Sequence, residues 1–261
     1  MSAYNVRLFD YKHSQQIRIY TKTVNCKDEK EEIKSDSKKN DIKDSKENEQ
    51  KEENEIDTER SQKVSVNRTK QKIYEITRAN TWDWFITLTF DREKIDSSDY
   101  DTLLATVRKW FNNVRSRKCP NMKYLIIPEL HKDGIHYHFH GLLASCDGLT
   151  FEDSGVVQNG KRVYNIRDFG FGFTTATRVE DTRKVSSYIS KYITKDLEEH
   201  IKGKRRFLAS KNCEKVKITD YCMTDEELKT LLESVAEDIT HMKTQDIPLA
   251  HQRIKYIELK K

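Results

Sequence analysis

The sequence of 261 residues contains no apolar run that approaches the ~18–20 residues of a membrane span, and its N-terminus lacks the apolar core of a secretory signal. Its five cysteines are scattered, odd in number and never spaced as C-x-x-C. These absences argue against a membrane protein, a disulfide scaffold and a cysteine-based zinc finger. We therefore expect a protein that stays in the cytosol.

Charge is abundant but unevenly distributed. Charged residues make up 35% of the chain, equal to the hydrophobic share, and the mean hydropathy is −0.88. Residues 27–60 hold 14 acidic and 9 basic residues, a net of −5, so the remainder carries +10 although the whole chain carries +5. A surplus of that size suits a polyanionic partner such as nucleic acid, whose phosphates bind clustered lysine and arginine.

The composition divides the chain into four segments. Residues 1–26 predict a small element of short strands. Residues 27–61 contain too little apolar surface to offset chain entropy, which predicts a disordered acidic linker. Residues 62–212 are the expected folded domain, and residues 213–261 are expected to form a helical tail with a capping box over Thr224–Glu227.

Hydrophobic periodicity within residues 62–212 predicts both strands and helices. Alternation of apolar and polar residues is typical of strands, and a spacing of three to four is typical of amphipathic helices. The expected fold class is therefore α+β. The predicted strands are 84–90, 123–129, 136–143, 161–167 and 172–178, with a loop of about 145–161 and helices over about 98–117 and from about 181.

Four of the eight histidines fall within ten residues. Side chains alternate between the faces of a strand, so His136, His138 and His140 share one face. Asp133-Gly134 is typical of a two-residue hairpin turn, and this register places Glu129 directly opposite His138. A carboxylate beside a row of imidazoles predicts a divalent metal site and leaves open which two histidines bind.

A second group of chemistry-bearing residues lies on the helix that follows Asp181. Tyr188 and Tyr192 are four residues apart on one face, and Lys191 and Lys195 repeat that spacing beside them. A phenol attacks a phosphate only where its anion is favoured, which neighbouring ammonium groups or a metal on the phosphate achieve. Tyrosines on an apolar stripe are more often core residues. A catalytic role for this pair is therefore favoured only because a metal site is also predicted.

Together these residues predict phosphodiester transesterification, in which a metal orients the scissile phosphate and a tyrosine attacks it. The motifs resemble those of the HUH endonucleases, and among them the rolling-circle replication initiators of bacterial plasmids and single-stranded DNA phages. The resemblance covers about residues 62–212 and rests on three ordered motifs, over 85–90, 138–143 and 188–195. A basic stretch at the end of this domain offers DNA contacts at Lys202, Lys204, Arg205 and Arg206.

The resemblance implies roles for particular residues. It selects His138 and His140 as metal ligands with Glu129 as the third, and it leaves His136 as a neighbour of the ligands. It implies Mn²⁺ or Mg²⁺ as the cofactor, Tyr192 as the principal nucleophile and Tyr188 as a second one. The implied fold is a five-stranded antiparallel sheet of RRM-like topology, with helices on one face and the site on the other.

The implied activity is replication initiation by nicking of single-stranded origin DNA, often presented as a hairpin, with a 5′-phosphotyrosyl intermediate and rejoining of strands in the cytoplasm of a bacterial host. No G-x-x-x-x-G-K-[ST] motif is present, so unwinding requires a separate host helicase. Three alternatives remain. They are a transposase or relaxase with the same chemistry, a structural zinc site, and a non-catalytic RRM-like binder of single strands that stacks bases on Trp84, Tyr137 and Phe139.

Overall fold

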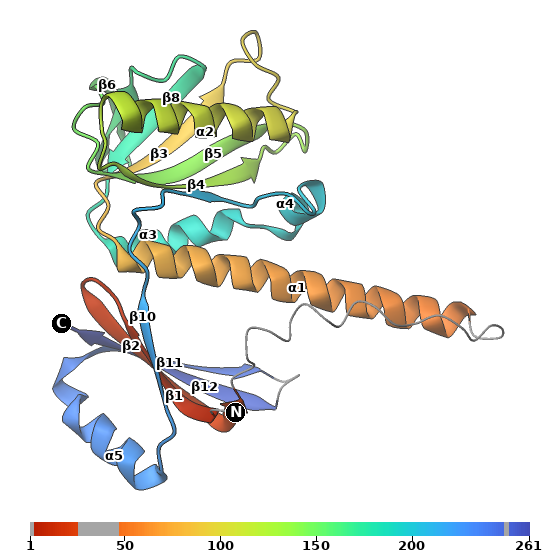
Figure 1. The fold of residues 1–261 in the computed structure, drawn as a ribbon, viewed down its shortest axis with the longest axis vertical. Coiled ribbons are helices and arrows are strands. Elements are labelled where there is room, and N and C mark those ends of the chain that lie inside the picture. The colour runs from red at the N-terminus through yellow and green to blue at the C-terminus, as the bar shows by residue number, and fades with distance from the viewer. Residues whose placement is uncertain (1–2, 26–46, 248–250) are drawn as a thin grey trace. The chain divides into compact units, whose positions relative to one another are not determined.

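The chain divides into two units in a computed structural model. The structure describes residues 3–25, 47–247 and 251–261, apart from the side chains of 47–60, 195, 196 and 198. One unit combines Met1–Asn54 with Val216–Lys261, and the other is Glu55–Lys215. The two ends of the chain therefore belong to one unit, whereas the sequence suggested separate N-terminal and C-terminal segments (Figure 1).

The smaller unit is a five-stranded antiparallel sheet with the order β10-β1-β2-β12-β11. Leu228, Leu231 and Leu232 of helix α5 pack against a core that includes Val6 and Ile257. The predicted capping box is confirmed, but the prediction of a helical tail was wrong, because the tail also contributes strands to this sheet. The elements are β1 (Ala3–Asp10), β2 (Ser14–Asn25), β10 (Lys217–Tyr221), α5 (Asp225–Ser234), η2 (Ala236–Asp238), β11 (Ile239–Ile247) and β12 (Gln252–Lys260).

Helix α1 (Glu47–Ala79) occupies part of the predicted linker. The prediction of disorder was wrong from Glu47 onward, and residues 27–46 lie outside the described residues. The physical reason is composition, because Glu, Lys and Gln have high intrinsic helix propensity. Further along, Val66 and Ile73 are buried in the core of the larger unit. None of the described helices is long and apolar enough to cross a membrane.

The larger unit contains a seven-stranded antiparallel sheet with the order β6-β7-β8-β3-β5-β4-β9. The five predicted strands are present. Strand β6 lies within the predicted loop, because its mostly exposed side chains give no burial pattern, and β9 adds a short pairing to β4. The elements are β3 (Trp84–Phe90), α2 (Tyr100–Arg117), β4 (Lys123–Leu130), β5 (Tyr137–Ala144), β6 (Phe151–Gln158), β7 (Lys161–Ile166), β8 (Gly172–Arg178), α3 (Thr182–Ile189), η1 (Ser190–Tyr192), α4 (Lys195–His200) and β9 (Leu208–Ala209).

The two faces of this sheet differ in what covers them. Helix α2 lies across one face (Figure 1), and its Val107 and Phe111 share a buried core with Ile86 of β3. On the other face, the Phe85 ring of β3 contacts the Tyr192 ring of η1 at 6.5 Å between centroids. The sequence led us to expect helices on one face and the site on the other. The tyrosines do lie over the face opposite α2, but α3 and η1 carry them there, so both faces bear helices.

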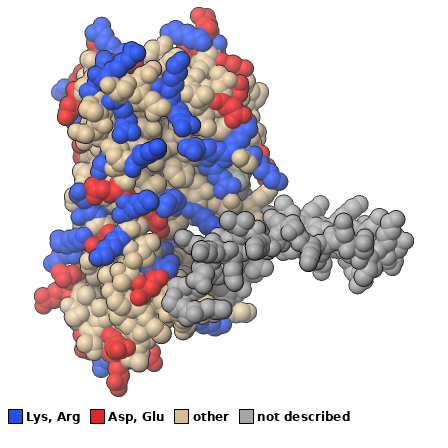
Figure 2. All heavy atoms as spheres, in the orientation of Figure 1, with Lys and Arg blue, Asp and Glu red and all other residues tan. Residues whose placement is uncertain are grey.

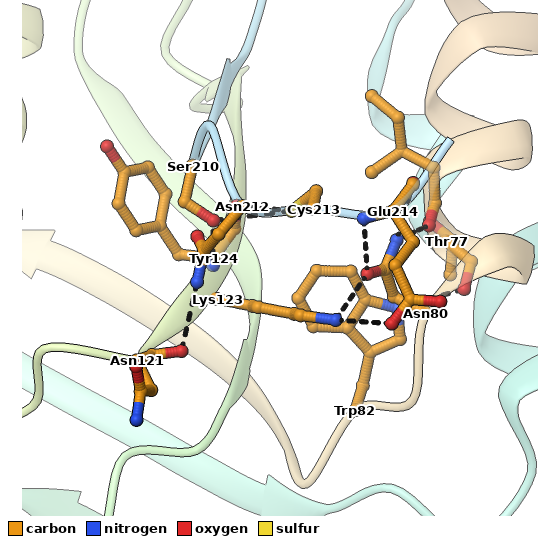
Figure 3. Close-up of polar contacts among 11 residues, drawn as sticks. Thr77, Asn80, Trp82, Asn121, Lys123, Tyr124, Ser210, Asn212, Cys213 and Glu214 are labelled. Carbon is orange, nitrogen blue, oxygen red and sulfur yellow. Dashed lines mark hydrogen bonds and ion pairs between the residues drawn. The ribbon is translucent and has the colours of Figure 1, made fainter.

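The last segment of the larger unit is fastened by polar contacts that Figure 3 draws. The Lys123 ammonium at the start of β4 donates to Asn80 Oδ1 at 3.0 Å and to Glu214 Oε1 at 2.8 Å. The Glu214 backbone N–H donates to the same Asn80 oxygen at 2.9 Å, and the Asn80 side chain is fully buried. These contacts join the end of α1 to the segment after β9, so the larger unit extends past residue 212.

The positive charge of the larger unit is spread out. Figure 2 shows lysine and arginine side chains scattered over the face that carries α2. A scattered distribution gives nonspecific attraction to phosphates without defining a path for a strand. The residues that define such a path must therefore be identified from their contacts.

Candidate metal and tyrosine site

Strands β4 and β5 bring one carboxylate and two imidazoles together. Glu129 pairs with His138 across the two strands, and Ile127 pairs with His140, as the hairpin register predicted. The Glu129 Oε2 atom lies 2.5 Å from His138 Nε2 and 2.6 Å from His140 Nε2. The three ligand atoms all lie within 4.8 Å of one another. The sequence therefore predicted the position of this cluster correctly.

The close pairing of β4 and β5 requires a residue without a side chain directly after His140. A Cβ atom on Gly141 would lie 2.3 Å from Ile126 Cδ1 and 2.9 Å from the Leu125 carbonyl oxygen. Both atoms belong to β4, so the glycine lets the two strands approach and keeps His140 in register with Glu129.

The charge states of this cluster suit a cation. Burial raises the pKa of Glu129, but the hydrogen bonds with His138 and His140 outweigh burial and bring that pKa to about 2. Burial lowers the pKa of His140 and outweighs the opposing effect of Glu129. Near neutral pH the cluster therefore offers a carboxylate and a neutral imidazole.

His140 has a further partner on β3. The Thr87 hydroxyl lies 3.0 Å from His140 Nδ1, and the two residues are paired across β3 and β5. A hydroxyl can donate or accept, so it suits either tautomer of the imidazole. When Nε2 holds a cation, Nδ1 carries the proton and donates it to Thr87, which fixes the ring. Sequence reasoning placed Thr87 on the correct strand but missed this contact.

His136 belongs to the hairpin turn. Strand β5 begins at Tyr137, and His136 Nδ1 lies 2.7 Å from Asp133 Oδ2. The other Asp133 oxygen accepts the backbone N–H groups of Ile135 and His136. His136 is therefore engaged in the turn and makes no hydrogen bond with Glu129 among the contacts of the described residues.

The two tyrosines lie beside this cluster. The Tyr192 ring stacks on the His140 ring with 3.8 Å between centroids and 13° between planes. Its hydroxyl donates to the Tyr188 hydroxyl at 2.8 Å. Tyr188 is 50% exposed, so the interpretation that it is a core residue does not hold for it. Helix α3 ends before Tyr192, which lies on η1 instead of the single predicted helix.

The surroundings of Tyr192 oppose its ionisation. Burial raises the pKa of the Tyr192 phenol, and the hydroxyl of Tyr188 and the charge of Glu129 raise it further. A cation at the neighbouring cluster would act in the opposite direction, since it neutralises Glu129 and favours a nearby anion. Without a cation, Tyr192 as placed here is therefore held in its neutral form near neutral pH.

The predicted cationic residues have different surroundings. Lys191 is exposed and lines a cavity beside the tyrosines, and the Lys195 side chain lies outside the described residues. Lys204 pairs with Asp101 at 2.7 Å. The Arg206 guanidinium donates to the Ser65 hydroxyl, the Ser65 carbonyl oxygen and the Thr69 hydroxyl of α1. Lys202 and Arg205 are exposed.

Three aromatic residues that one alternative assigned to base stacking are buried. Trp84 is 5% exposed, Tyr137 7% and Phe139 0%. They lie in the core shared with α2. A non-catalytic binder that stacks bases on these three rings is therefore wrong for this chain.

The donor set fits a divalent cation. Two imidazole nitrogens and one carboxylate oxygen converge from adjacent strands, and nitrogen and oxygen donors of this kind suit Mn²⁺, Mg²⁺ or Zn²⁺ to different degrees. Three protein ligands leave positions for substrate oxygens, whereas a structural zinc site uses four. The fold and the site thus define an α+β domain with a cluster of three candidate metal ligands and an adjacent tyrosine pair.

The comparisons agree with this class of protein. Residues 83–197 match the model of the replication-associated protein ORF2 family. That span holds Glu129, His138, His140 and both tyrosines, so this part of the chain is similar to a family of rolling-circle replication initiators. No curated protein and no solved structure matches the chain. The recognition of a replication initiator from the sequence is confirmed at the level of the family.

Proposed function

We propose that this protein is a replication-initiation endonuclease of the HUH type. It nicks single-stranded origin DNA by tyrosine attack, forms a 5′-phosphotyrosyl intermediate and rejoins strands in rolling-circle replication. The observation that carries the proposal is the position of Tyr192, which stacks on His140 at 3.8 Å and contacts the Tyr188 hydroxyl at 2.8 Å. A nucleophile next to a cation cluster is what phosphoryl transfer by a tyrosine requires.

The cluster of Glu129, His138 and His140 would hold the ion, Mn²⁺ or Mg²⁺ in this proposal. When bound, the ion supplies charge that polarises a phosphoryl oxygen and favours a nearby phenolate. The chain itself orients the His140 imidazole through Thr87 and fixes Tyr192 by stacking. These fixed side chains hold the attacking oxygen beside the phosphate without further rearrangement.

The proposed step forms one bond and breaks one. Tyr192 Oη attacks phosphorus, and the bond between phosphorus and the 3′-oxygen breaks. The phenolic proton leaves through the exposed Tyr188 hydroxyl, to which Tyr192 donates, and the departing 3′-oxygen takes up a proton from solvent. The products are a 5′-phosphotyrosyl ester and a free 3′-hydroxyl, from which a polymerase extends. Tyr188 serves as the second nucleophile for termination or strand transfer.

A replication initiator is expected to bind DNA. We propose that the substrate is a single strand at an origin hairpin, and that a separate host helicase unwinds the duplex. The cationic contacts proposed for the strand include Lys191, Lys195, Lys202 and Arg205. The setting we propose is the cytoplasm of a bacterial host.

A covalent-adduct assay tests the function. Oligonucleotides that tile the DNA flanking the gene are labelled at the 3′ end and incubated with the full chain and Mn²⁺ or Mg²⁺. A denaturing gel should show a labelled protein band that EDTA abolishes. Tyr192→Phe should remove most of this band. Tyr188→Phe should retain it but form it more slowly, because the proton of Tyr192 must then leave directly to solvent.

A third tyrosine variant serves as the control. Tyr164 packs edge-on against Trp84 at 5.2 Å on a different part of the sheet, so Tyr164→Phe should form the adduct as the wild type does. If the wild type gives no adduct on any flanking sequence with either metal, the proposed function is wrong. If only Tyr188→Phe loses the adduct, the assignment of Tyr192 as principal nucleophile is wrong.

A further inference from the structure

A cavity extends away from the tyrosines across the open face of the sheet. Its volume is about 980 Å³, and one end contains Tyr188, Tyr192 and His140. The other end reaches Gln158 and Asn159 at the turn between β6 and β7. This volume lies near the upper end for small-molecule sites, so it exceeds what one reacting phosphate needs.

The floor of the cavity consists of alternate residues of β3 and β8. Phe85 pairs with Thr177 and Thr87 pairs with Thr175, so all four point to this face. Three of the four carry hydroxyl groups, which donate to and accept from sugar and phosphate oxygens. The floor is therefore mostly polar, which suits an extended chain of sugars and phosphates.

One wall of the cavity carries cations that form no ion pair among the described side chains. Arg183 and Lys184 of α3 and Lys191 of η1 line the cavity and are exposed. Among the described side chains, none of the three forms an ion pair. Two acids also line the cavity. Asp181 caps α3 by accepting from backbone N–H groups and interacts with the charges of Arg183 and Lys184, and Glu180 pairs with Lys161 at 3.1 Å. The lining still holds five cationic side chains against these two acids, namely Lys161, Arg178, Arg183, Lys184 and Lys191, so it carries net positive charge.

The basic stretch over residues 202–206 differs in this respect. Lys204 is paired with Asp101, and Arg206 is bound to Ser65 and Thr69 of α1. Breaking such contacts would offset part of any gain from binding phosphate. The unpaired cations beside the tyrosines are thus the better phosphate ligands.

We propose that this cavity binds a segment of single-stranded DNA continuous with the strand that the tyrosines cleave. Arg183 and Lys184 hold its phosphates, and the turn between β6 and β7 contacts its far end. The inference rests on the proposed function. Only a single strand fits, because a hollow of 980 Å³ between a helix and the sheet has room for a few nucleotides and not for a duplex.

The test measures the salt dependence of binding in EDTA, where no cleavage interferes. The probe is fluorescein-labelled dT20. Anisotropy titrations of the full chain run from about 50 to about 300 mM NaCl, a range in which affinity depends steeply on the number of phosphate contacts. Removal of two phosphate contacts by the double variant Arg183→Gln/Lys184→Gln should reduce the slope of log K against log salt by about 1.4. Near 0.1 M salt this corresponds to binding about 25-fold weaker than that of the wild type.

A matched control is available on the opposite face. Arg108 and Lys109 are an adjacent and exposed Arg-Lys pair on α2, so Arg108→Gln/Lys109→Gln removes the same charges. This control should keep the wild-type slope. The inference is overturned if the control loses as much slope as the Arg183/Lys184 variant, or if that variant binds dT20 as the wild type does.

Two further arms separate the possible failures. A labelled 20-base-pair duplex should bind the wild type and the Arg183/Lys184 variant with equal slopes, and an equal loss on duplex and single strand would overturn the assignment to a single strand. The adduct assay on the wild type reports the tyrosine chemistry independently. Adduct formation with unchanged dT20 binding in the variant refutes only the cavity, whereas reduced dT20 binding without any wild-type adduct refutes only the chemistry.

Discussion

Replacement of Thr87 by valine tests whether the β3 hydroxyl supports the metal site. Valine has nearly the same shape as threonine but cannot accept the proton on His140 Nδ1, which now lies 3.0 Å from the Thr87 hydroxyl. His140 is only 8% exposed, so water has little access to replace the lost partner. The variant therefore leaves a nearly buried N–H group without an acceptor whenever Nε2 holds a cation.

The expected magnitude follows from that unsatisfied group. Leaving a buried donor without a partner costs about 1–3 kcal/mol, and each 1.4 kcal/mol is about tenfold in affinity. Mn²⁺ affinity should therefore fall by about 10- to 100-fold, the range typical of lost partners of ligating histidines. Thr87→Ser keeps the hydroxyl and should restore most of the affinity.

Isothermal titration calorimetry with Mn²⁺ in the absence of DNA measures this effect without reference to catalysis. Thr89 provides the control, since it lies two residues further along β3, is exposed and does not contact His140. Thr89→Val should bind Mn²⁺ as the wild type does. Wild-type affinity in Thr87→Val, or equal losses in the two valine variants, would refute the proposed role of the hydroxyl.

Three other outcomes are expected. Gly141→Ala places a Cβ within 2.9 Å of a β4 carbonyl oxygen and should lower the free energy of unfolding in urea by about 1–3 kcal/mol. Gly170→Ala, whose Cβ meets nothing within 4 Å, should change that free energy by less than about 0.5 kcal/mol. Equal effects of the two substitutions would contradict the packing argument. Burial raises the pKa of Asp168, but the Lys118 ammonium and a backbone amide outweigh burial and lower it. The stability that Asp168 contributes is therefore present above its unfolded pKa of about 3.9 and is lost as pH falls through its folded-state pKa. Asp168→Asn should flatten the acid limb of a curve of unfolding free energy against pH. An unchanged acid limb would contradict a stabilising role for the contact between Lys118 and Asp168. Mn²⁺ binding by the Glu129 cluster should weaken as pH falls below about 6 because the imidazoles must be neutral, and calorimetric affinities independent of pH between 5 and 8 would be incompatible with histidine ligands.

Short-range sequence patterns were sufficient to predict much of the candidate site. Alternation in β5 and the Asp133-Gly134 turn were sufficient to place Glu129 opposite His138, as the structure has it. The spacing of Tyr188 and Tyr192 correctly put the two hydroxyls within reach of each other. Each of these relations spans about ten residues or fewer, so chain geometry alone constrains it.

Long-range packing decided the rest. The partner of His140 lies on β3, at Thr87, and nothing in either local sequence specifies that the two strands are neighbours. Strand β6 escaped prediction because exposed side chains leave no alternation, although Asn159-Gly160 after it is itself a hairpin signal. The pairing of β2 with β12 joins residues from the two ends of the chain.

The sequence by itself thus determined which residues are candidate metal ligands and nucleophiles, because such candidates are residue types at short spacings on regular elements. Only the tertiary structure decided which of the described cations form ion pairs, which hydroxyl contacts His140, and that the Tyr192 ring stacks on His140. These properties depend on which surfaces become buried against each other, and burial results from contacts between segments far apart in the chain.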